Sequence, residues 1–137
     1  MTPRAEPRTP DPTLSLDDAA PRAWVLNLDA ELELRHPDRY QPTQRTLLAC
    51  RHFESLARTL IRPGDLVLSR EAAPVRNSAA GYRGAAWCPT PSVLAFLERA
   101  GATLPAAPPL ACLQRVNHRR FHAELGQTLP TPSWRPT

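Results

Sequence analysis

Proline is the residue that most limits what this chain can fold into. The 137-residue sequence contains 17 prolines, and most of them cluster in residues 3–21, 105–109 and 130–136. Proline fixes φ and lacks a backbone N–H, so such clusters interrupt helices and central strands. We therefore expect a disordered tail at residues 1–21, one folded domain at 22–130 and a short tail at 131–137.

The basic residues set limits on the class of partner. All 17 are arginine, and the formal net charge is +4. Arginine recognises phosphate well, but these residues are scattered from Arg4 to Arg135 without a dense basic block. We attribute the excess to the codon bias of a GC-rich, bacterial genome and expect no nucleic-acid partner.

The same composition bears on the cellular compartment. No apolar run is long enough to span a membrane, and no signal peptide is visible. The three cysteines have no CxxC spacing, which fits thiols in a reducing environment. The sequence therefore predicts a cytoplasmic protein with no membrane partner.

Two short apolar runs with a helix between them predict an α/β fold. Residues 24–28 and 66–69 read as buried strands. Apolar residues recur at three- and four-residue spacing over residues 43–61, which predicts a helix with Thr43 as its N-cap. Its apolar face would contain Leu47, Leu48, Phe53, Leu56, Leu60 and Ile61. A strand–helix–strand order implies parallel strands with a right-handed crossover, so we expect a small three-layer, Rossmann-like domain with a short parallel sheet.

The next part of the chain predicts a long loop and a second helix. Residues 70–89 show no periodicity and read as a loop, and loops of this length in small domains are usually functional or mobile. Thr90, Pro91 and Gly101 are typical of a helix cap, a first helical residue and a helix end. Residues 102–104 could add a very short third strand.

Three acidic residues follow the first expected strand. Asp29, Glu31 and Glu33 alternate with apolar residues, as in an extended strand or a loop at its end. Ligands of α/β folds bind at the carboxyl ends of strands, so a carboxylate site is one interpretation. A solvated strand edge is the preferred one, because no basic or histidine partner is identifiable nearby.

Three other patterns have both a functional and a structural interpretation. His118 and His122, with Cys112 six residues earlier, could hold zinc, but no second ligand pair has metal spacing, so surface histidines are preferred. Residues 81–84 match neither the GxGxxG nor the Walker motif, which favours a loop tip. Cys88 precedes a helix start, where the pKa of a thiol falls, but it lacks an identifiable histidine partner. We expect no metal site and no catalytic residue.

The stretch LQRVNHRRFHAELGQTLPTP, residues 113–132, predicts a last helix with Asn117 as N-cap, Phe121 as apolar anchor and Gly126 as its end. A Leu129–Pro130 step follows. This arrangement resembles the junction at which the Rossmann-like pre-ATP-grasp domain of ATP-grasp proteins passes into the nucleotide-binding domain. The segment WVLNLDAELEL is similar to the first strand of such a domain.

The resemblance implies a function. In that family a basic residue after the cap reaches the nucleotide phosphates, and here His118, Arg119 and Arg120 occupy this region, so the resemblance implies that they bind the nucleotide. ATP-grasp enzymes use ATP and magnesium to form an acyl phosphate that an amine or thiol captures. Because these 137 residues lack the ATP-grasp domain, the resemblance implies a domain that is not catalytic alone.

Such a domain would form one wall of a substrate or nucleotide cleft. It would use ATP and magnesium only when joined to an ATP-grasp partner domain, and it could form a homodimer. The alternative is a small stand-alone protein-interaction domain with no nucleotide role, which would use residues 70–89 and the acidic segment 29–33.

Overall fold

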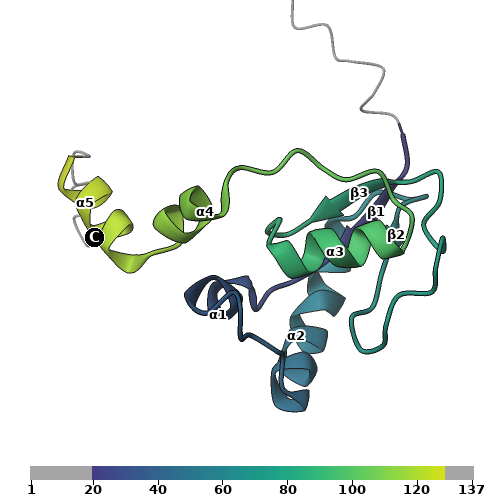
Figure 1. Cartoon of the computed structure of the whole chain (residues 1–137), viewed down its shortest axis with the longest axis horizontal. Coiled ribbons are helices and arrows are strands. Elements are labelled where there is room, and N and C mark those ends of the chain that lie inside the picture. The colour runs from purple at the N-terminus through teal and green to yellow at the C-terminus, as the bar shows by residue number, and fades with distance from the viewer. Residues whose placement is uncertain (1–19, 129–137) are drawn as a thin grey trace, which may run out of the picture.

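The structure is a computed structural model that describes residues 20–128 (Figure 1). Within this range the elements are β1 (Arg22–Val25), α1 (Ala30–Arg35), α2 (Gln44–Ala57), the 3-10 turn η2 (Arg58–Leu60), β2 (Leu66–Val67), β3 (Arg83–Ala86), α3 (Pro91–Arg99), α4 (Leu110–Val116) and α5 (Arg119–Thr128). No helix in the described part of the chain is long and apolar enough to cross a membrane.

The three strands form one parallel sheet in the order β2-β1-β3. Trp24 of β1 lies opposite Val67 on one side and Ala85 on the other. The crossover through α2 connects β1 to β2 at one edge of the sheet. At the opposite edge the chain continues from β3 into α3. Right-handed crossovers in opposite directions put the two helices on opposite faces of the sheet. The prediction of a small three-layer α/β domain with a short parallel sheet is confirmed.

The hydrophobic core lies between the sheet and α3, which crosses in front of the strands in Figure 1. Alternate residues of β1, Ala23 and Val25, face this layer, as the two-residue period of a strand requires. Val93 and Leu97 of α3 are fully buried against them. Thr90, Pro91 and Gly101 begin and end this helix as predicted, and Gly101 has a φ of 80°.

The third strand lies inside the segment that the sequence predicts to be a loop. Residues 83–86 read Arg-Gly-Ala-Ala, a composition with low strand propensity, yet β3 pairs with β1 along its whole length. Gly84 is required there by packing, because a Cβ atom would lie 2.9 Å from the Thr103 carbonyl oxygen and 3.0 Å from Leu97 Cδ1. Thr103 itself forms a parallel bridge to Arg83, close to the expected third strand at 102–104.

Helix α2 begins at the predicted cap, but its apolar residues do not share one buried face. The Thr43 hydroxyl accepts a hydrogen bond from the Thr46 amide at 3.2 Å, which fixes the first turn. Cys50 is the only fully buried residue of the helix. Leu48, Phe53, Leu56 and Leu60 are exposed. Most of the predicted apolar face of this helix is therefore exposed.

The C-terminal helices extend away from the sheet beyond residues 104–109 (Figure 1). Helix α4 contacts α1, and the Gln114 side chain donates to the Leu34 carbonyl oxygen at 3.0 Å. Asn117 ends α4 instead of capping the next helix, and α5 continues through Gly126 to Thr128. These two helix-boundary predictions were wrong. Leu129, Pro130 and both expected tails, apart from residues 20 and 21, lie outside the described residues.

Candidate functional site

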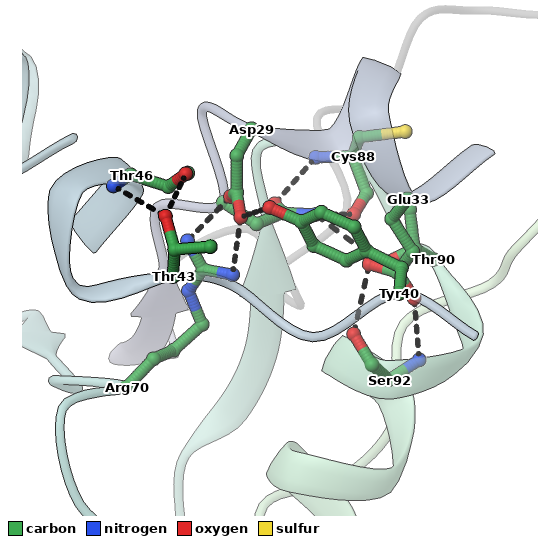
Figure 2. Close-up of polar contacts among 10 residues, drawn as sticks. Asp29, Glu33, Tyr40, Thr43, Thr46, Arg70, Cys88, Thr90 and Ser92 are labelled. Carbon is green, nitrogen blue, oxygen red and sulfur yellow. Dashed lines mark hydrogen bonds and ion pairs between the residues drawn. The ribbon is translucent and has the colours of Figure 1, made fainter. Parts of the chain in front are cut away.

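A cluster of polar side chains lies at the carboxyl ends of the three strands (Figure 2). Because the strands are parallel, the segments that follow them meet at one edge of the sheet, where α/β folds bind ligands. The segment after β1 contributes Asn27, Asp29, Glu33 and Tyr40, the one after β2 contributes Arg70, and the one after β3 contributes Cys88, Thr90 and Ser92.

A buried ion pair joins the first two of these segments. Arg70 donates to both carboxylate oxygens of Asp29, at 2.5 and 3.3 Å, and the Tyr40 hydroxyl donates to Oδ2 at 2.6 Å (Figure 2). The side chains of Arg70 and Asp29 are only 11% and 3% exposed. This is the basic partner that the sequence analysis did not identify for Asp29.

The surroundings fix the protonation states of this group. Burial raises the pKa of Asp29, but hydrogen bonds from Arg70 and Tyr40, with the positive charge of Arg70, outweigh burial and hold that pKa below its ordinary value. Burial and then the Asp29 carboxylate raise the pKa of Tyr40 well above its ordinary value. Asp29 is therefore a weak base and Tyr40 a weak acid at neutral pH, so neither is suited to proton transfer.

Glu33 joins the first and third segments. Its carboxylate accepts hydrogen bonds from the Thr90 hydroxyl at 2.7 Å, the Ser92 hydroxyl at 2.8 Å and the Ser92 amide at 3.1 Å. Ser92 lies in the first turn of α3, whose N-terminal amides favour an anion. The sequence predicted a solvated strand edge here, but the structure has helix α1 instead. Of the charged residues of α1, only Glu31 and its i,i+4 partner Arg35 face solvent.

Replacing Glu33 with glutamine should lower the free energy of unfolding by about 1–2 kcal/mol. Glutamine keeps the shape of the side chain, but its NH2 group replaces one of the two acceptor oxygens, so at least one of the donors of Thr90 and Ser92 loses its acceptor, and the negative charge at the α3 N-terminus is lost. Urea unfolding at neutral pH measures the change. Glu31→Gln is the matched control, with an expected change below about 0.5 kcal/mol, because its ion pair with Arg35 is exposed. Equal effects of both changes would contradict this role of Glu33.

Asn27 and Cys88 join the same segments through their backbone and amide groups. Asn27 Nδ2 donates to the Cys88 carbonyl oxygen at 2.7 Å, and the Cys88 amide donates to Asn27 Oδ1 at 3.0 Å. Burial and then the charge of Glu33 raise the pKa of the Cys88 thiol. The thiol therefore stays protonated at neutral pH, which argues against a role as nucleophile.

The polar cluster consequently holds the strand ends together. Every buried side-chain nitrogen and oxygen within residues 20–127 has a hydrogen-bond partner. Position in the sequence is the signal that could have identified Arg70 as the partner of Asp29. Arg70 comes three residues after the end of β2, and Asp29 comes four residues after the end of β1. Parallel strands place two such residues at the same edge.

The residues expected to bind a nucleotide lie elsewhere, at the junction of α4 and α5. His118 and Arg119 line a pocket of about 610 Å³ between this junction and α1. The remaining lining residues are Glu31, Leu34, Arg35, His36, Gln114 and Asn117. Arg120 lies outside this pocket and lines a second one of about 430 Å³ with Phe121 and Glu124, which shares Gln114 and His118 with the first. The pocket thus brings together two of the three predicted residues and adds Arg35 and His36.

Metal coordination has no candidate in the part of the chain that the structure describes, where no group of three or more His, Cys, Asp or Glu side chains could hold a metal ion. His118 is instead engaged at the start of α5, where its Nδ1 accepts from the Arg120 amide at 3.1 Å. No family model, curated protein or solved structure matches this chain.

Proposed function

We propose that this chain is a non-catalytic domain of the pre-ATP-grasp kind that forms one wall of a phosphate-binding cleft. An ATP-grasp partner domain would supply the other wall, together with the ligands for magnesium. The observation that carries the proposal is the pocket between α1 and the α4–α5 junction, because it gathers His36, His118 and Arg119 around one space.

The chemistry of the pocket fits an anion such as a phosphate group. Its lining contains two arginines and two histidines against one carboxylate, Glu31, which Arg35 already pairs at 2.7 Å. His118 accepts a hydrogen bond at Nδ1, so in the neutral ring the proton is on Nε2, which is a donor. Arg119 begins α5, a ten-residue helix whose N-terminal dipole adds to the attraction for a negative charge.

The pocket by itself offers a shallow and solvated site. Its arginines are exposed, and charge attraction at exposed positions is weak and screened by salt. Tight nucleotide binding would therefore need the partner domain to close the cleft.

The proposal also includes a cellular location. The three free cysteines fit a protein that works in the reducing cytoplasm.

Arg119→Ala should weaken binding of inorganic triphosphate to the chain about tenfold, because the variant loses a charge-assisted hydrogen bond. Isothermal titration at low salt measures the affinity. Arg120→Ala is the matched control, since the neighbouring arginine lines another pocket and its loss should change the affinity less than twofold. Equal losses in the two variants, or no binding by the unmodified chain, would contradict the phosphate site.

The partner domain has its own test. The DNA directly downstream of codon 137 should encode an ATP-grasp domain, in frame or in an adjacent frame. Mixing the two products with ATP and magnesium should give tighter nucleotide binding than either product gives alone. A downstream region without such a domain would remove the ATP-grasp part of the proposal and leave the anion site.

One observation favours the second candidate, a protein-interaction domain with no nucleotide role. Helix α2 exposes large apolar side chains, whereas ordinary surface helices turn them to the core. Within the acidic segment 29–33, Asp29 and Glu33 are buried and bonded inside the domain, so Glu31 is the carboxylate that this segment would present to a partner.

A further inference from the structure

Helix α2 carries an apolar stripe that the described part of the chain leaves uncovered. Phe53 and Leu56 are 57% and 61% exposed, and Leu60, which lies in the 3-10 turn η2 that continues the helix, is 83% exposed. Together with the exposed Ala49 they are spaced four, three and four residues apart, the spacing of the seam of a two-helix coiled coil. We call Ala49, Phe53, Leu56 and Leu60 the α2 seam.

Apart from Arg45, which precedes Ala49 by four residues on the same side of the helix, the charged residues of α2 and η2 lie away from the α2 seam. Arg51 pairs with Glu71, and it lines a small pocket beside β2 together with Glu54 and Arg58. At 100° per residue these three side chains fall on the opposite half of the helix. The α2 seam is therefore free of charge from Ala49 to Leu60, and the neighbouring His52 ring packs edge-on against Phe53 at 5.4 Å between centroids.

The helix needs a second surface to pack against. It is 14 residues long, and helices of this length are marginal in water unless an apolar face is buried. Within the domain α2 fully buries only Cys50. The exposed parts of the apolar side chains on α2 and η2 present on the order of 400 Å², roughly half of what each partner buries in a standard interface.

We propose that the α2 seam is the centre of a homodimer interface, in which α2 of one chain packs on α2 of a second copy across a twofold axis. A seam with a regular repeat and no charge is complementary to itself, so a second copy can cover it without burying an unpaired charge. The α2 seam shares no residue with the phosphate pocket, so this proposal and the proposed function stand or fail separately.

Light scattering coupled to size exclusion, on the full chain in reducing buffer, tests the proposal. The unmodified chain should have twice the mass of one chain at about 100 μM and dissociate on dilution. Phe53→Glu should weaken the dimer about 100-fold or more, because it would bury a carboxylate in each half of the interface. Leu56→Glu should do the same. A monomer at every concentration would overturn the proposal.

Three control variants separate the α2 seam from other routes to a dimer. Val75→Glu places the same charge on an equally exposed apolar residue outside α2 and should leave the dimer unchanged. Cys112→Ser should also leave it unchanged, since the exposed Cys112 thiol could form an intermolecular disulfide without reductant. Leu125→Glu tests whether α5, and not α2, forms the dimer interface. The proposal would be overturned if Leu125→Glu dissociated the dimer while the Phe53→Glu variant still dimerised.

Discussion

Replacing Arg70 with alanine should lower the free energy of unfolding by about 3–5 kcal/mol, because it leaves the buried Asp29 carboxylate without its cation. Burial makes this pair different from ion pairs at the surface, where water and salt weaken the interaction. Both side chains of the pair are nearly inaccessible. Urea unfolding at pH 7 measures the loss.

Arg35→Ala is the matched control for Arg70→Ala. Arg35 also pairs with a carboxylate, that of Glu31 at 2.7 Å, but both side chains are 53% exposed. Its loss should cost less than about 0.5 kcal/mol. A double change to Asp29→Asn with Arg70→Met should recover part of the stability, because no unpaired charge is then buried. If the Arg70 and Arg35 variants are equally stable, the ion pair does not have this role.

The pH dependence follows from the same pair. The pKa of Asp29 is lower in the folded protein than in the unfolded chain, so the ionised pair stabilises the fold above the ordinary pKa of aspartate. This contribution should disappear as the pH falls through the lowered folded pKa. The difference in stability between the unmodified protein and Arg70→Met should therefore be largest near neutral pH and shrink below about pH 4.

Replacing Gly84 with valine should prevent stable folding, and Gly84→Ala should cost about 2–3 kcal/mol. The new Cβ meets the Thr103 carbonyl oxygen at 2.9 Å and Leu97 Cδ1 at 3.0 Å. Thr103 cannot retreat easily, because its carbonyl oxygen accepts from the Gly84 amide at 2.7 Å and its amide donates to Tyr82 at 3.0 Å. Leu97 is fully buried in the core.

Thermal unfolding followed by circular dichroism measures the effect of the Gly84 changes. Gly126→Ala is the control, since Gly126 lies within α5 with no atom within 4 Å of an added Cβ. There alanine should keep or raise helix stability, by up to about 1 kcal/mol, because glycine is a poor helix former. A Gly84→Ala variant as stable as the Gly126→Ala variant would show that β3 can move away from α3.

The elements that sequence predicted well are those with a strong local signal. Thr43, Thr90 with Pro91, and Gly101 mark helix boundaries through capping and φ preferences that act within a few residues. The apolar runs at β1 and β2 are also local. These signals were sufficient for the fold class, because a helix between two buried strands leaves few arrangements.

The elements that sequence missed depend on distant contacts. Strand β3 has a weak local signal, and its Gly84 is explained only by Leu97 and Thr103, which approach it from other parts of the chain. The pairing of Asp29 with Arg70 spans 41 residues and needs the parallel sheet to bring them together. The exposure of Phe53, Leu56 and Leu60 could not be predicted either, because periodicity shows which residues share a side of a helix but not what that side meets.

The polar cluster also determines how the domain comes apart. Strand β2 contains only two residues, too few to hold an edge of the sheet by backbone pairing alone. Arg70, which follows β2, is hydrogen-bonded to Asp29. Asn27 and Glu33 are hydrogen-bonded to the segment after β3. While these hydrogen bonds remain, the strands should not separate one at a time. We therefore expect β2 and the start of α3 to open in a single cooperative event, so that the amide protons of both regions have the same protection from solvent exchange.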